Sequence, residues 1–165
     1  MPEAERLYQN ALGHESRFEG MRPVFPALQV AIVTCMDSRI DVFKIFGLEP
    51  GEAHILRNGG GIVTPDVLRS LVLSQRLLKT NAIILMHHTD CGLQKVDEAK
   101  ISEELLAETA QLPPYTFGAF RDVDAAVRTA IKKVREHPFL AHRDNVRGFV
   151  YEVETGRVRE VQRGT

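Results

Sequence analysis

Two spacings of hydrophobic residues alternate along the chain. Short, nearly continuous apolar runs are typical of parallel strands covered on both faces, and they lie at residues 29–34, 53–57, 82–87 and 146–153. Between them, apolar residues recur every three or four positions, as on one face of a helix, at 41–46, 64–78 and 123–134. This alternation predicts an α/β fold, with a small, mainly parallel β-sheet of four to five strands flanked by helices.

Capping residues support these boundaries. Gly47 follows the short helix and suits its C-terminal end, where left-handed backbone is common. Thr64 and Pro65 have the chemistry of an N-cap and a first helical residue, and Pro138 ends the last helix. Residues 154–156 predict a turn after the last strand, and the tail that follows is interpreted as a short hairpin arm.

Two segments stand outside the alternation. Residues 4–18 predict an amphipathic helix whose apolar stripe must be buried on its own sheet or on a partner subunit, and residues 19–29 predict a loop. Residues 93–112 are helical in pattern but polar, with Glu103 and Glu104 on a solvated face, so we expect an exposed excursion. The chain is interpreted as one domain, 1–165, in which 1–28 form a helical arm and loop.

Composition excludes several classes of protein. The 165 residues carry a net charge of −1, with 44% hydrophobic and 26% charged residues, which is ordinary for a globular domain. No basic stripe favours nucleic acid, and no run approaches membrane-spanning length. No block of signal-peptide type occurs in the first thirty residues, so we expect a cytoplasmic protein. In that compartment two cysteines more often bind metal or catalyse than form a disulfide.

Both cysteines follow predicted strands. Cys35 ends the first apolar run, and His88 and Cys91 follow the third. The carboxyl ends of strands in an open α/β sheet line the site crevice. Two thiolates and one imidazole suit zinc, which in catalytic sites has three protein ligands and one open position. We therefore expect Cys35, His88 and Cys91 to bind Zn²⁺.

Other interpretations of these residues remain open. The cysteines could be buried structural residues, or they could form a disulfide or redox pair. A closed structural zinc site would need a fourth ligand, for which Asp37, His87 and Asp90 are candidates. Neighbouring side chains in a strand point to opposite faces, and the spacing to Cys91 favours His88 over His87.

The remaining histidines have plainer interpretations. We expect His54 to be structural. His14, His137 and His142 are most simply solvated surface residues, with proton transfer as the alternative.

Asp37 and Arg39 lie just beyond Cys35. Elsewhere such a pair would be a surface ion pair of little energetic value. Beside a metal, the carboxylate can orient a metal-bound water, and the guanidinium can hold that carboxylate in place and ionised. Two thiolates cancel the charge of zinc and leave its water less acidic than in a three-histidine site, which explains the need for such a pair. Asp37 could instead move onto the metal and occupy its open position.

Three motifs resemble those of the β-class carbonic anhydrases, most closely the short bacterial and archaeal branch. They are Cys35-Met36-Asp37-Ser38-Arg39, Arg57-Asn58-Gly59-Gly60 and His88-Thr89-Asp90-Cys91-Gly92. The resemblance implies a zinc site of Cys35, His88 and Cys91, with Asp37 and Arg39 as the pair that controls the fourth position. It also implies that backbone N–H groups of Gly92, and of Gly60 in the glycine loop, help to hold substrate. The family forms homodimers or higher oligomers, in which the N-terminal helix reaches the partner.

The chain departs from the family pattern in two places. Gly59 stands where the family usually has alanine, which should loosen the loop slightly. The glutamine that some members use to bind bicarbonate has no clear counterpart.

The expected activity is reversible, zinc-dependent hydration of carbon dioxide to bicarbonate and a proton. One alternative is hydrolysis of carbonyl sulfide or carbon disulfide on the same scaffold. The other is a non-enzymatic zinc-binding or redox-sensing protein.

Overall fold

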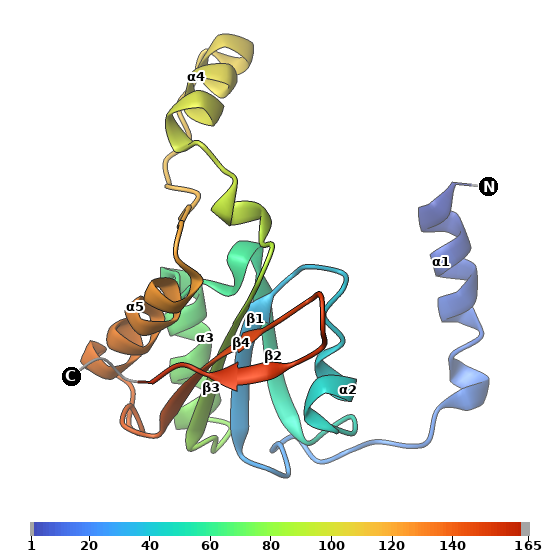
Figure 1. Cartoon of the computed structure of the whole chain (residues 1–165). Coiled ribbons are helices and arrows are strands. Elements are labelled where there is room, and N and C mark those ends of the chain that lie inside the picture. Colours follow the sequence, from blue (N-terminus) through green and yellow to red (C-terminus); the bar gives the residue numbers. More distant parts are fainter. Residues whose placement is uncertain (1, 163–165) are drawn as a thin grey trace.

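A five-stranded sheet in the order β2-β1-β3-β4-β5 forms the centre of the computed structural model, which describes residues 2–162 (Figure 1). The first four strands are mutually parallel, and β5 pairs antiparallel with β4. The strands are β1 (Val30–Cys35), β2 (Ala53–Asn58), β3 (Ala82–His88), β4 (Val146–Tyr151) and β5 (Val158–Glu160). The prediction of a small, mainly parallel sheet is confirmed.

The register places two strand ends side by side. Strand β1 lies between β2 and β3, with Thr34 opposite Met86 of β3 and Cys35 opposite Asn58 of β2. The Thr34 hydroxyl also donates to the carbonyl oxygen of Met86 at 2.8 Å. The turns that follow β1 and β3 therefore begin at the same edge of the sheet.

Helices cover both faces of the sheet. Helices α3 (Pro65–Arg76) and α5 (Val123–Glu136) pack on one face, and the short α2 (Val42–Phe46) packs on the other (Figure 1). The larger core lies under α3 and α5, where Leu71, Leu85 and Val134 are completely buried. The predicted caps are confirmed: Thr64 accepts from the N–H of Val67, and Gly47 ends α2 with φ of 63°.

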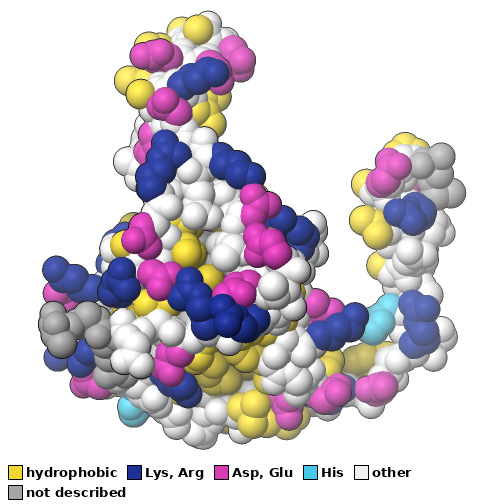
Figure 2. All heavy atoms as spheres, in the orientation of Figure 1, with side chains coloured by type: hydrophobic (Ala, Val, Ile, Leu, Met, Phe, Trp, Pro, Cys, Tyr) yellow, Lys and Arg dark blue, Asp and Glu magenta, His cyan; other side chains and the backbone are white. Residues whose placement is uncertain are grey.

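Two helices project from this body (Figure 1). The predicted helix 4–18 is shorter than expected: α1 (Glu3–Leu12) is capped by Gly13, and a 3₁₀ turn (Glu15–Arg17) follows. The predicted excursion consists of a 3₁₀ turn, η3 (Gly92–Gln94), and of α4 (Glu98–Thr109). Neither α1 nor α4 contains a buried residue, and both carry hydrophobic side chains on the surface (Figure 2).

The C-terminal hairpin arm is also confirmed, although β4 ends two residues earlier than predicted. The N–H of Glu152 donates to the carbonyl of Arg157, which closes the turn between β4 and β5. Basic and acidic side chains are mixed over the face shown in Figure 2. Of the helices that the structure describes, none has the length and apolarity to span a membrane.

Candidate metal centre

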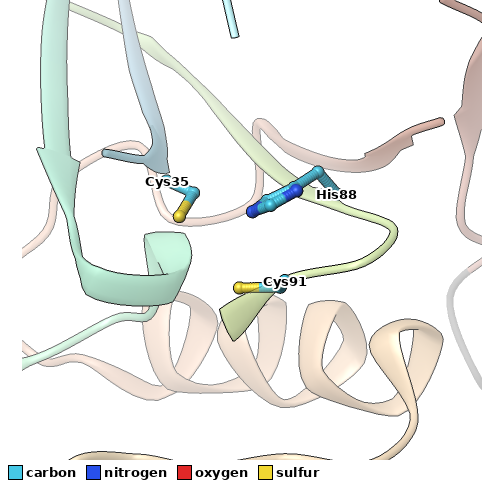
Figure 3. Close-up of side chains that lie close together, drawn as sticks. All are labelled: Cys35, His88 and Cys91. Atoms are coloured by element: carbon cyan, nitrogen blue, oxygen red, sulfur yellow. The ribbon is translucent and has the colours of Figure 1, made fainter. Parts of the chain in front are cut away.

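Three side chains from two neighbouring strand ends converge at the carboxyl edge of the sheet. Cys35 is the last residue of β1, His88 is the last of β3, and Cys91 follows three residues later. Their ligand atoms all lie within 4.8 Å of one another, and all three residues are buried. Both sulfur atoms and the imidazole point toward a common space (Figure 3). The structure therefore brings together the three residues that the sequence identifies as candidate ligands.

The donor atoms of this cluster fit a metal ion. Neither ring nitrogen of His88 has a hydrogen-bond partner among the described residues, although the side chain is fully buried. An unsatisfied buried polar group is costly, and a metal bond would satisfy it. Both cysteines are free thiols, and two thiolates with one imidazole are a donor set that zinc accepts.

Neighbouring groups change the pKa values of the two thiols and fix the backbone beside them. The N–H of Gly60 points at the sulfur of Cys35 from 3.3 Å. The neighbouring Cys91 thiol lowers the pKa of Cys35 most, and the nearby His88 ring and backbone N–H groups lower it further, although burial opposes this. The pKa of Cys91 is raised, because its proton is held in the hydrogen bond to Cys35 and because the thiol is buried. Gln94 fixes the Cys91 backbone by accepting from its N–H at 3.1 Å.

Asp37 and Arg39 form a bidentate ion pair beside the cluster. Arg39 Nε donates to Asp37 Oδ1 at 2.9 Å and Nη2 donates to Oδ2 at 2.7 Å, while the Arg39 N–H also donates to Oδ1. These bonds hold the pKa of Asp37 well below its usual range. Asp37 Oδ2 lies 3.9 Å from His88 Nε2, so the carboxylate stands at the border of the metal-binding space.

Arg39 has a second carboxylate partner that sequence reasoning missed. Its Nη1 donates to Asp90 Oδ2 at 2.9 Å, and its Nη2 reaches the Asp90 carbonyl at 3.1 Å. Lys95 donates to the other oxygen of Asp90, and these two cations lower the pKa of Asp90 to about 2. Asp90 has a φ of 52°, which only a few residue types adopt readily. The sequence alone indicates Asp90 only as a candidate fourth ligand.

Arg57 supports the first turn from the neighbouring strand. Its Nε donates to the carbonyl of Cys35 at 2.9 Å, and its Nη2 donates to the carbonyl of Asp37 at 2.7 Å. The sequence contained a signal for this role, since Arg57 belongs to a motif of the family and β2 lies beside β1.

The glycine loop after β2 approaches the cluster closely. Gly61 has a φ of 65°, and a Cβ atom there would lie 2.7 Å from the backbone nitrogen of Cys35. Gly59 has no heavy atom within 4 Å of its virtual Cβ position, so alanine would fit there. Gly92 begins the 3₁₀ turn directly after Cys91 and is equally open.

The other histidines lie outside the cluster. His87 is fully buried on the opposite face of β3, where its ring meets Phe120 edge-on, and burial lowers its pKa to about 4. His54 Nδ1 lies 2.8 Å from the hydroxyl of Ser74, which supports a structural role. His14 and His142 are exposed, and His137 is half-buried.

Comparisons with known proteins agree with this geometry. The sequence model of the carbonic anhydrase family matches residues 30–158. Beta-carbonic anhydrase 1 of Mycobacterium tuberculosis is 41% identical over 152 residues, which cover 92% of this chain and 93% of that protein. The crystal structure of carbonic anhydrase from Streptococcus mutans superposes with a TM-score of 0.90 at 40% identity, over 98% of this chain and 99% of that one.

A second activity occurs among the relatives. Carbon disulfide hydrolase of Saccharolobus solfataricus is 35% identical over 155 residues, which cover 78% of this chain and 75% of that protein. The family match and the high coverage of the carbonic anhydrase relatives nevertheless agree with the motifs, the sheet order and the buried Cys-His-Cys cluster: the chain belongs to the β-carbonic anhydrase family.

Proposed function

We propose that this protein catalyses the reversible hydration of carbon dioxide to bicarbonate and a proton, with a zinc ion bound by Cys35, His88 and Cys91. The observation that carries the proposal is the convergence of these three buried donors beside a carboxylate held by arginine. Membership of the β-carbonic anhydrase family supports the reaction. When bound, zinc supplies Lewis-acid chemistry, which makes a water molecule acidic enough to act as a nucleophile near neutral pH.

Asp37 and Arg39 are proposed to orient that nucleophile. The low pKa of Asp37 keeps its carboxylate ionised, so it can only accept a hydrogen bond. Its two oxygens are fixed by three bonds from Arg39, which leaves little rotational freedom to the carboxylate. A fixed acceptor at the border of the cluster would hold the attacking oxygen in one orientation, and fixed geometry lowers the entropic part of the barrier.

Substrate binding is proposed to combine apolar contacts with backbone donors. The smaller core on the α2 face contains both cysteines together with Ile40 and Met86, with Leu93 packed against it. These side chains suit a neutral, apolar substrate. We keep Gly92 as a proposed N–H donor for bicarbonate. The N–H of Gly60 is directed at Cys35 in the structure, so its proposed contact with substrate would compete with that hydrogen bond.

A metal analysis combined with a rate assay tests the proposal. Purified protein should contain one zinc per chain by mass spectrometry, and stopped-flow mixing with carbon dioxide should show rapid acidification. Removal of zinc with a chelator should abolish the rate, and added zinc should restore it. Zinc-loaded protein that hydrates carbon dioxide no faster than buffer would refute the proposed reaction.

The carbon disulfide hydrolases among the relatives make a second candidate activity worth measuring. The same preparation should be assayed with carbon dioxide, carbonyl sulfide and carbon disulfide at equal concentrations. We expect carbon dioxide to be preferred, because the relatives with the higher identity and coverage are carbonic anhydrases. Zinc without activity on any of the three would favour a binding or sensing role.

We also propose that the protein acts as a homodimer or higher homo-oligomer in the cytoplasm. Helix α1 exposes Leu7, Tyr8 and Leu12 and buries nothing within its own chain, so a second copy is the proposed cover. A reducing compartment would keep both thiols available for metal. Light scattering of the purified protein measures the oligomer, and a mass of one chain would contradict it.

A further inference from the structure

A second cavity lies behind the metal-binding strand, on the opposite face of the sheet. It has a volume of about 320 Å³ and lies between β3, the loop before α5, and α5 itself. Since His87 and His88 are neighbours in β3, their side chains point to opposite faces, so His87 lines this cavity while His88 belongs to the cysteine-histidine cluster. Nothing in the proposed reaction uses the cavity.

An unpartnered imidazole lines the cavity. His87 is fully buried, and neither of its ring nitrogens has a hydrogen-bond partner among the described residues. Its ring meets the ring of Phe120 edge-on, with the two centroids 5.7 Å apart. Buried polar atoms are nearly always paired with protein or with ordered water. A group inside the cavity that forms a hydrogen bond would satisfy this imidazole.

A cation stands in the same cavity. Lys133 is exposed, and its ammonium donates to the carbonyl of Val63 at 3.2 Å, which uses one of its three N–H bonds. No carboxylate forms an ion pair with Lys133 in the described part of the chain, whereas the adjacent Lys132 pairs with Glu136. A carboxylate near Lys133 would find a charged donor that is still available.

Apolar surface separates these two polar groups. The walls include Ile62, Phe120, Ala126 and Ala130. A cavity of about 150 Å³ is large enough to hold benzene, so this one has room for a ring with two substituents. The ligand that complements all three features has a compact apolar body, a carboxylate at one end and a hydroxyl at the other.

We propose that this cavity is a binding site for small hydroxylated carboxylic acids. The carboxylate pairs with Lys133, the apolar body packs against Ala126 and Ala130 of α5, and the hydroxyl forms a hydrogen bond with His87. A hydroxyl can both donate and accept, so it can pair with either nitrogen of the imidazole. The carboxylate gains a charge-assisted hydrogen bond.

The probe is 4-hydroxybenzoate, titrated into the zinc-loaded, full-length protein and followed by calorimetry and protein NMR. Benzoate lacks the hydroxyl, and phenol lacks the carboxylate. We expect saturable binding with a dissociation constant of about 1 mM or lower. Benzoate should bind about five-fold more weakly, as loss of one neutral hydrogen bond predicts. These readouts do not depend on enzymatic rate, so they stand apart from the test of the proposed reaction.

Three variants locate the site. Lys133→Met should weaken both acids about ten-fold and leave phenol unchanged, whereas Lys132→Met, the matched control, should leave all three probes unchanged. Ala126→Leu should fill the cavity and abolish binding. In His87→Leu the difference between 4-hydroxybenzoate and benzoate should vanish.

Several results would overturn the assignment. They are absence of saturable binding to the wild type, equal affinity for the two acids, or binding that survives Ala126→Leu, which would place the probe elsewhere, for example at the metal. If His87→Leu does not fold, the two α5 variants still decide the question, because they lie on a different element from the metal cluster.

Discussion

Arg39 Nη1 donates to Asp90 Oδ2 at 2.9 Å, while Nε and Nη2 of the same guanidinium donate to the carboxylate of Asp37. Asp37 follows β1 and Asp90 follows β3, so one guanidinium ties together the two turns that bring the cluster into place. Lys95 in turn fixes the far oxygen of Asp90. The ion pair predicted from the sequence is thus the inner part of a four-residue chain.

Asp90→Asn should therefore slow carbon dioxide hydration without loss of zinc. Asparagine accepts the left-handed backbone at this position but removes the charge that holds Arg39. We expect a decrease of about five-fold in kcat/KM, measured by stopped flow with zinc content determined in parallel. Lys95→Met removes only the outer, exposed member, which leaves the bonds of Arg39 to Asp37 and Asp90 in place, so we expect a change in rate of less than about two-fold. A fully active Asp90→Asn enzyme would show that Arg39 does not need its second partner.

His88→Ala should abolish stoichiometric zinc binding. The imidazole is one of three donors, and two thiols alone cannot complete a stable zinc site in this buried space. Zinc per chain should fall below about one tenth, and hydration should fall at least about 100-fold. His142→Ala is the matched control, because that histidine is exposed and should leave both quantities unchanged. Retention of a full equivalent of zinc by His88→Ala would mean that the metal binds elsewhere.

Two of the three glycines in the loop after β2, Gly59 and Gly61, should respond oppositely to alanine. In Gly61→Ala the new Cβ would lie 2.7 Å from the Cys35 nitrogen at a positive φ, so we expect a loss of about 2–4 kcal/mol in the free energy of unfolding. In Gly59→Ala the new atom meets open space, and the stiffer unfolded chain should add about 0.4–1 kcal/mol. Urea unfolding of the two variants and the wild type at neutral pH measures both changes in the free energy of unfolding. Similar midpoints for the two variants would contradict the close approach of the loop to β1.

Asp124→Asn should reduce stability at neutral pH but not in acid. Arg159 holds this carboxylate with bonds of 2.6 and 2.9 Å and lowers its pKa below the unfolded value. The stabilisation is therefore present above the unfolded pKa of about 3.9 and disappears as the pH falls through the folded pKa. Because both side chains are about one third exposed, we expect only about 0.5–1 kcal/mol at pH 7.

Urea unfolding at pH 7 and near pH 3 compares the two proteins directly. The midpoints should differ at pH 7 and converge near pH 3. Glu136→Gln, which breaks an exposed helical pair with Lys132, serves as control and should change little at either pH. If the urea midpoint of Asp124→Asn stays equally far below that of the wild type in acid, the loss of stability comes from packing and not from the ion pair.

Local patterns in the sequence were sufficient to predict the strands, the helix caps and the positions of the three donors at neighbouring strand ends. Apolar runs that end in Cys35 and His88 identify both the strands and the edge where they end, because a parallel sheet places its carboxyl ends together. The early end of α1 at Leu12 was not predicted, because the apolar positions of residues 4–18 continue the helical spacing beyond it. The bonds of Arg39 with Asp90, and the support from Arg57, depend on how two turns face each other. Periodicity carries no information about such contacts.

The order of the strands has a consequence for how the protein acquires its metal during synthesis. Cys35 emerges from the ribosome roughly fifty residues before His88 and Cys91, and its strand gains a neighbour on that side only when β3 docks beside it. A nascent chain that ends before residue 88 offers a lone thiol with weak affinity for zinc. Zinc can therefore bind tightly only after β1 and β3 have come together. Cells starved of zinc should accumulate a folded protein without metal rather than a partly synthesised chain that holds the ion.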